Sequence, residues 1–386
     1  MSGLRNLKSV LPIFLICLMV PCNMVVAEER LNKAIRLESH LLGHLDSMWN
    51  PALRNKWKES GFSISNSTST QGTPPLLDSI TMAKKSERRV DANLLEMSLH
   101  DVISRCESGD LNLLPLHQVL PDGVTLADYV WNGVQPCAIG HSVWATYPVF
   151  DTTRYIDRSA PVLMQDFFNT TAYPGKRAMK KSPQAIVEWA LLTSGIPRRD
   201  IYRALSSDKI WPLIEKKLQQ LASEIIWVDT DQEALELLDS GSASFAMVSS
   251  YNLVRKIAEN NKLRRSSDHY GVIWNRAVAH MSFLAIPKNS EADGVLDFLR
   301  FIIDPIRNLQ MSTALGYAPV SRGHASLINE RYRRALPVDS NTDDLLWGND
   351  KWWREQGGEI EELFQSFAER TFQLETAQKG KNIFDG

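Results

Sequence analysis

The sequence predicts an α/β fold of sheets flanked by helices, arranged as two domains. Two stretches carry this prediction. Residues 270–322 contain two apolar runs of strand length followed by two capped helices. Residues 224–260 alternate strand, helix, strand and helix. The length of 386 residues fits two domains of ordinary size.

The first 27 residues have the pattern of a secretory signal. Arg5 and Lys8 form a basic start, Val10–Val20 is an apolar core, and Val25–Ala27 is a small-residue cleavage site. The alternative is an uncleaved membrane anchor, but the apolar run is shorter than the roughly 20 residues that span a bilayer. We therefore expect export and cleavage.

The composition that remains after cleavage excludes some partners and predicts a disulfide. Cleavage leaves 386 − 27 = 359 residues and removes two basic side chains, so the formal charge becomes −2 − 2 = −4. This balance gives no reason to propose nucleic acid as a partner. Cys106 and Cys137 are the two cysteines left, and an even pair in an exported chain indicates one disulfide. The alternative is two buried thiols.

Between residues 31 and 150 the strand and helix signals are short. The following elements are expected: a strand start at Ile35–Leu42, a helix from about Ser47 to Ser60, a strand at Ala92–Met97, a helical turn at Asp101–Arg105, and a strand at Val143–Phe150.

Residues 164–260 carry clearer boundary signals. Ser182 is expected to cap a helix that Pro183 opens and Gly195 ends. Thr230 with Glu233 forms a capping box. The remaining elements are expected at Ile210–Ser223 (helix), Glu224–Asp229 (strand), Phe245–Tyr251 (strand) and from Asn252 to about Asn260 (helix).

In residues 270–322, the strands are expected at Val272–Trp274 and Met281–Ile286. The capping pattern of Ser290 with Asp293 starts a helix through Ile303. Asp304 as N-cap and Pro305 at the first position start the next helix, which Gly316 ends. Near the C-terminus, Lys351 begins a helix with Ile360, Leu363, Phe364 and Phe367 at helical spacing.

Several of these motifs together resemble a known family. They are Tyr173–Arg177, Trp274-Asn275, Leu284–Lys288, Pro305–Leu315 and Tyr317–Pro319. In order and spacing they are similar to the periplasmic substrate-binding proteins of ABC transporters, in the spermidine/putrescine-binding branch. The resemblance covers roughly Leu94 to Phe372.

The resemblance implies a two-lobed periplasmic binding protein fold of type II, with the ligand in a cleft between lobes. It implies a monomer in the periplasm whose hinge closes on a small molecule and which then meets the permease of an importer. It also supports the pairing of Cys106 with Cys137, which lie in matching motifs. The expected divisions are 1–27 for the signal, 28–143 with 277–318 for lobe 1, and 144–276 with 319–386 for lobe 2.

The ligand-binding candidates are mostly aromatic side chains near matching positions. Stacked aromatics would cover the methylenes of a polyamine and attract its charge by about 0.5–2 kcal/mol each. Carboxylates would then pair with its ammonium ends, because a buried unpaired charge is costly. The candidates are Trp144, Trp227, Asp229, Tyr251, Trp274, Asn275, His280 and Tyr317.

One departure from the branch concerns these carboxylates. The branch usually places Asp on the strand before Ala-Ile-Pro, where this chain has Ala279–Ser282 and no acid. Asp229 is the best remaining acid and Asp166 a weaker one. A different small amine, an uncharged solute or an acid therefore stay open as ligands beside a polyamine.

The sequence contains no recognisable catalytic constellation, no cofactor motif and no metal site that we favour. His40 and His44 lie four residues apart, with Asp46 nearby, but no third ligand or catalytic Glu accompanies them. We therefore expect a binding protein rather than an enzyme. The alternative function is a periplasmic sensor of the same fold that signals to a membrane receptor.

Overall fold

A computed structural model describes residues 33–39, 58–66, 92–130, 132–290 and 294–384. The expected signal segment, the His40 and His44 pair, and most of the helix expected at 47–60 lie outside the described residues. Asp293 of the expected capping pattern also lies outside them.

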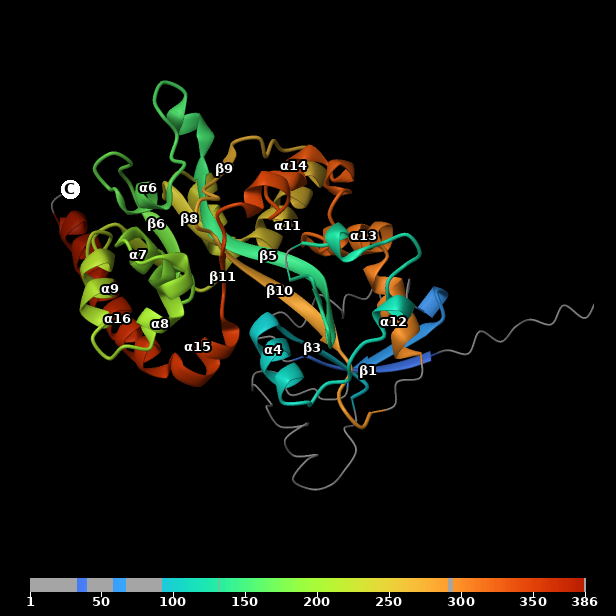
Figure 1. Cartoon of the computed structure of the whole chain (residues 1–386). Helices are drawn as coiled ribbons and strands as arrows, with labels where there is room; N and C mark the ends of the chain where they lie inside the picture. The colour runs from blue at the N-terminus through green and yellow to red at the C-terminus, as the bar shows by residue number, and fades with distance from the viewer. Residues whose placement is uncertain (1–32, 40–57, 67–91, 131, 291–293, 385–386) are drawn as a thin grey trace, which may run out of the picture. The chain divides into compact units, whose positions relative to one another are not determined.

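The strands of the described residues join into a single mixed sheet (Figure 1). They are β1 (Lys33–Ser39), β2 (Phe62–Asn66), β3 (Leu94–Ser98), β4 (Val134–Gln135), β5 (Ala138–Asp151), β6 (Arg177–Lys180), β7 (Ile225–Val228), β8 (Phe245–Ser249), β9 (Tyr270–Val272), β10 (Val278–Ala285) and β11 (Leu346–Trp347). Their main order is β2-β1-β3-β10-β5-β8-β6-β7.

The helices flank this sheet. They are α4 (Leu99–Glu107), α5 (Leu116–Val119), α6 (Met164–Phe168), α7 (Ile186–Thr193), α8 (Ile201–Leu205), α9 (Trp211–Leu218), α10 (Asp231–Asp239), α11 (Ser250–Lys262), α12 (Val295–Ile303), α13 (Pro305–Leu315), α14 (Glu330–Arg333), α15 (Asp350–Gln356) and α16 (Gly358–Phe384). In the described part of the chain, no helix is both long and apolar enough to cross a membrane.

Strand β5 connects the two halves of the sheet. Its first part pairs with β10, from Ala138 to Thr146, and its last part pairs with β9, from Val149 to Asp151. On its other edge, β5 pairs with β8 from Thr146 to Phe150, with Pro148 opposite Met247. In Figure 1, β5 and β10 run side by side from β3 and β1 at one end toward β8 and β6 at the other.

Apolar packing holds the two halves. One core, including Ile35, Leu95 and Phe298, covers β1, β3, β10 and α12 and continues to α11. A second core, including Trp189 and Phe364, lies among α6–α9, α15 and α16. Because β5 contributes to both cores, its middle is fixed where the two halves meet.

Most boundary signals are confirmed. Thr230 and Glu233 form the capping box of α10, Asp304 caps α13 with Pro305 at its first position, and Gly316 ends that helix in the left-handed conformation. The expectation for Ser182 is wrong, because its hydroxyl bonds the Gln184 side chain and α7 begins at Ile186.

Two strand expectations also need correction. The strand expected to reach Tyr251 ends at Ser249, so Tyr251 lies in the first turn of α11. The strand expected at Val272–Trp274 lies earlier, at Tyr270–Val272, and Trp274 follows in a connection to β10.

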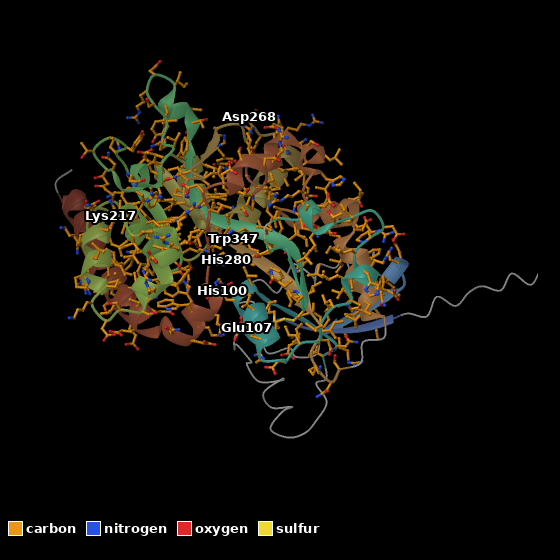
Figure 2. All side chains as sticks on the ribbon, viewed as in Figure 1. His100, Glu107, Lys217, Asp268, His280 and Trp347 are labelled. Atoms are coloured by element: carbon orange, nitrogen blue, oxygen red, sulfur yellow. A yellow bond between two sulfur atoms is a disulfide. The ribbon has the colours of Figure 1, made fainter. Side chains whose placement is uncertain are left out.

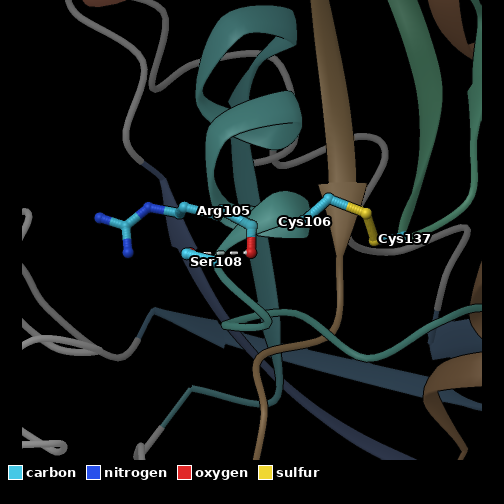
Figure 3. Close-up of a disulfide and its surroundings, with 4 residues drawn as sticks. All are labelled: Arg105, Cys106, Ser108 and Cys137. Carbon is cyan, nitrogen blue, oxygen red and sulfur yellow. Dashed lines mark hydrogen bonds between the residues drawn. A yellow bond between two sulfur atoms is a disulfide. The ribbon is translucent and has the colours of Figure 1, made fainter.

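A disulfide joins Cys106 in α4 to Cys137, one residue before β5, with Cα atoms 5.9 Å apart (Figure 3). The pairing agrees with the sequence expectation. Beside it, the Ser108 hydroxyl donates to the carbonyl of Arg105 at 3.1 Å and closes the end of α4. The bridge therefore ties this helix to the strand that connects the two halves.

Candidate functional site

Polar residues gather where several strands end. β6 ends at Lys180 and β8 at Ser249, and both strands run parallel with each other. Asp231, at the start of α10, lies between them: its carboxylate is 2.8 Å from the Lys180 ammonium and accepts from the Ser249 N–H and the Asn252 amide, both at 2.8 Å. The carboxyl ends of strands in α/β sheets are where ligands bind.

Asp231 is almost wholly buried. Burial opposes its ionisation, but Lys180 and the bonds from Asn252 and Ser249 outweigh that effect and lower the pKa of Asp231. It is an anion held between a cation and two donors. Sequence reasoning missed it and named Asp229 instead, because a residue after a helix cap is normally at the surface.

Three aromatic rings lie side by side on one face of the sheet, each on a neighbouring segment of the chain. His280 in β10 is paired with Trp144 in β5, and their rings stack with centroids 5.4 Å apart. On the other side of β5, Ala318 bridges Val143, which places Tyr317 beside Trp144 at a centroid distance of 5.9 Å. Trp144 and Tyr317 are both buried.

Tyr251 extends this group, with its ring 5.3 Å from that of Tyr317. Gly316 permits the approach, since a Cβ there would overlap the backbone of Tyr251 and its φ is +85°. We call His280, Trp144, Tyr317 and Tyr251 the aromatic row. It runs from β10 across β5 to the start of α11, near Asp231.

His280 receives a charged partner from far along the chain. Its Nδ1 lies 3.1 and 3.3 Å from the two carboxylate oxygens of Asp350, at the start of α15. The backbone can lie this close to the His280 ring only at a glycine, because a Cβ on Gly348 would overlap the imidazole. Burial acts to lower the pKa of His280, but the charge and hydrogen bond of Asp350 raise it above its ordinary value.

Helix α15 also reaches α4. The Arg354 guanidinium pairs with Asp101, and the Lys351 ammonium donates to the Ser104 hydroxyl at 3.1 Å. Asp101 in turn accepts from the hydroxyl of Ser98, the N-cap of α4, at 2.7 Å. The end of β3 is therefore tied to α15.

His100, also in α4, lies near His280 in Figure 2. Burial is the largest cause of its lowered pKa, and His280 adds to the effect. This helix turn and α15 thus bring titratable side chains to one end of the aromatic row.

Trp274 and Asn275 lie elsewhere. Trp274 packs edge-on against Tyr147 and donates to the carbonyl of Arg334 at 3.2 Å. Because Tyr147 and Trp144 are three residues apart in one strand, they lie on opposite faces of the sheet. Trp274 lines a pocket of about 460 Å³ on that other face. The Asn275 side chain bonds the Met164 N–H and Asp344.

Trp227 and Asp229 also lie apart from the aromatic row. The indole N–H of Trp227 donates to the Thr371 hydroxyl at 2.9 Å, and its ring packs on Phe364 of α16. Asp229 is exposed before α10. In the described ranges, no group of three or more His, Cys, Asp or Glu residues is arranged to hold a metal ion.

Comparisons with known proteins agree with this architecture. The family model described as "Bacterial extracellular solute-binding protein" matches residues 67–329. The chain is 24% identical over 246 residues to the gamma-aminobutyric acid-binding protein of Pseudomonas aeruginosa, covering 63% of this chain and 67% of that protein.

Two solved structures show the fold. The Atu4243-GABA receptor gives a TM-score of 0.63 at 19% identity, over 87% of this chain and 97% of its own. A spermidine/putrescine ABC transporter substrate-binding protein of Streptococcus pneumoniae gives 0.61 at 15% identity, over 88% and 99%. These likenesses confirm the fold class predicted from the sequence, a two-lobed α/β fold, although the described strands of this chain join into one sheet.

Proposed function

This chain belongs to the bacterial extracellular solute-binding proteins, and from that premise we propose that its ligand is a small molecule carrying both an ammonium group and a carboxylate. The observation that supports this is the aromatic row flanked by charges of both signs. Asp231 with Lys180 lies beyond one end, and Asp350 with His280 forms the other. As a member of this family, the protein is a binding protein for an ABC transporter and not an enzyme.

The aromatic row suits an amine on a short apolar chain. Aromatic faces attract an ammonium group by about 0.5–2 kcal/mol each and cover its methylenes. A polyamine, the ligand we first expect from the sequence, has only positive ends and needs acids that are not already paired with cations. Here Asp231 pairs with Lys180 and Asp101 with Arg354. A ligand that carries both charges can pair with an acid through its ammonium group and with a cation through its carboxylate, and so replace the pairs that these side chains make with each other.

Two further features support a ligand on this face. Ser282 in β10 is in register with Ser98 in β3 and Ser142 in β5, so three hydroxyls lie in a line beside the aromatic row. The Ser142 hydroxyl is buried, and no described residue bonds it. The gamma-aminobutyric acid-binding relative is named for a ligand of the proposed class.

We further propose the lobe boundaries expected from the sequence, with 28–143 and 277–318 in lobe 1 and 144–276 and 319–386 in lobe 2. Chain crossings near Trp144, Ala277 and Tyr317 then form the hinge, and closure brings α4 toward α15 and α11. Export to the periplasm with cleavage after Ala27 completes the proposal. N-terminal sequencing of the secreted protein tests the cleavage.

Calorimetric titration tests the ligand class. Residues 28–386 are unfolded and refolded to remove bound solute, then titrated with γ-aminobutyrate, butylamine, butyrate, putrescine and spermidine. We expect γ-aminobutyrate to bind about tenfold or more tighter than the probes that lack one of its charges, a difference of about 1.4 kcal/mol or more. Tighter binding of putrescine or spermidine would instead support the polyamine branch.

The sensor alternative has no structural observation in its favour, but it makes a distinct prediction. A sensor would bind its ligand and leave uptake unchanged when its gene is deleted. We expect deletion to abolish uptake of the ligand.

A further inference from the structure

The imidazole of His280 is held on two sides. Asp350 binds Nδ1, and the Trp144 indole stacks on the ring at an interplanar angle of 14°. The side chain is 14% exposed. Among the described residues, no hydrogen bond is made to Nε2. The second ring nitrogen is therefore available to accept or donate a further hydrogen bond.

Several charges face this ring from different elements. Asp350 comes from α15, Glu188 from α7 and His100 from α4, while Lys351 of α15 acts on His100. Asp350 acts most strongly, through its charge and its hydrogen bond, and Glu188 adds to it. Burial lowers the pKa of His100 and so disfavours its protonated form, and His100 and His280 repel each other when both are protonated. An indole face also favours a cation over a neutral ring.

We propose that Asp350 is a positioning residue that fixes Nδ1–H of His280, so that an imidazolium presents Nε2–H to the carboxylate of the ligand. This inference deepens the proposed function and rests on it. It assigns to helix α15 a part in choosing the ligand, through a residue that lies 70 positions from its partner.

The protonation state of His280 decides what Nε2 can bind. In the imidazolium form, Nε2–H donates a hydrogen bond to a carboxylate. In the neutral form, where Asp350 keeps the proton on Nδ1, Nε2 accepts a hydrogen bond and suits an ammonium group. Because the pKa of His280 is raised in the folded protein, the imidazolium persists to higher pH than in a free histidine. Affinity for a carboxylate ligand is therefore highest at low pH and falls as the pH rises through that raised pKa.

The test combines two measurements on residues 28–386. NMR of the His Cε1–H signals, assigned with a His280→Gln variant, gives the pKa of His280 in wild type and in Asp350→Asn. Calorimetry with γ-aminobutyrate and with butylamine, from about pH 5.5 to about pH 8.5, gives the affinity profile of each. Asp239→Asn is the matched control, because Asp239 faces His269 in a comparable pair away from the aromatic row.

We expect γ-aminobutyrate affinity in wild type to fall up to about tenfold per pH unit above the pKa of His280. Asp350→Asn should lower that pKa and move the fall to lower pH, while butylamine shows no such fall and Asp239→Asn keeps the wild-type profile. An unmoved profile in Asp350→Asn, with binding intact, overturns the inference alone. Binding of none of the probes at any pH overturns the proposed function as well.

Discussion

At the residue scale, Trp144 and Trp274 lie on opposite faces of the sheet at β5. Trp144 stacks on His280 and contacts Tyr317, whereas Trp274 packs on Tyr147 beside a pocket on the other face. We expect Trp144→Phe to weaken ligand binding by about two- to tenfold, because the smaller ring loses an aromatic contact of about 0.5–1.5 kcal/mol. Trp274→Phe should leave affinity within about twofold. Calorimetric titration of both variants tests whether the ligand binds on the face that carries Trp144. Loss of binding in Trp274→Phe alone would place the ligand on the face that carries Trp274.

Individual residues also show which parts of the candidate site could be predicted from the sequence. Trp144, His280 and Tyr317 lie at positions that the family resemblance marks, and the structure brings them together. Asp231 and Asp350 could not be predicted. Asp231 looks like a surface residue after a helix cap, and Asp350 meets His280 only because β11 pairs with β10 and carries α15 beside it.

At the element scale, the contact between α15 and α4 makes a further prediction. The Arg354–Asp101 pair has side chains only 17% and 7% exposed. We expect Arg354→Ala to lower the free energy of unfolding by about 3 kcal/mol, because Asp101 keeps its charge in a buried place without its cation. Hydrogen exchange should rise first at the ends of α4 and α15.

Arg370→Ala is the matched control. Arg370 pairs with Glu215 between α16 and α9, with side chains 54% and 33% exposed. An exposed pair contributes about 0–1 kcal/mol, so the stability should change little. Equal losses in the two variants would mean that the α15–α4 contact has no special role.

The disulfide gives a second prediction at this scale. Cys106 and Cys137 are 31 positions apart, and closing a loop of this length stabilises by roughly 3–4 kcal/mol. We expect Cys106→Ser with Cys137→Ser to lose about this amount in urea unfolding. Thiol titration of unfolded, unreduced residues 28–386 should find no free thiol, and one or two free thiols would contradict the pairing.

The elements themselves were predictable where a local signal decides the boundary. The capping box of α10 and the Asp304-Pro305 start of α13 need only neighbouring residues, and both are confirmed. The start of α7 depends instead on Ala185, whose φ of +69° delays the helix by three residues past Pro183. Alanine rarely adopts that conformation, so the short stretch of sequence around Ala185 gives no signal for it.

At the scale of the whole molecule, the hinge closure that we propose would depend on the balance between β5 and β10 and the α15–α4 contact. β5 and β10 connect the two halves, and α15 contacts α4 through Arg354 and Lys351. We expect this contact to favour the closed arrangement of the proposed lobes before ligand binds, so that the ligand shifts the population only slightly. Arg354→Ala should open the empty protein, so that the ligand produces a larger fall in its radius of gyration than in wild type. Small-angle X-ray scattering with and without γ-aminobutyrate measures both changes; an equal fall in the two proteins would show that α15 does not hold the cleft closed.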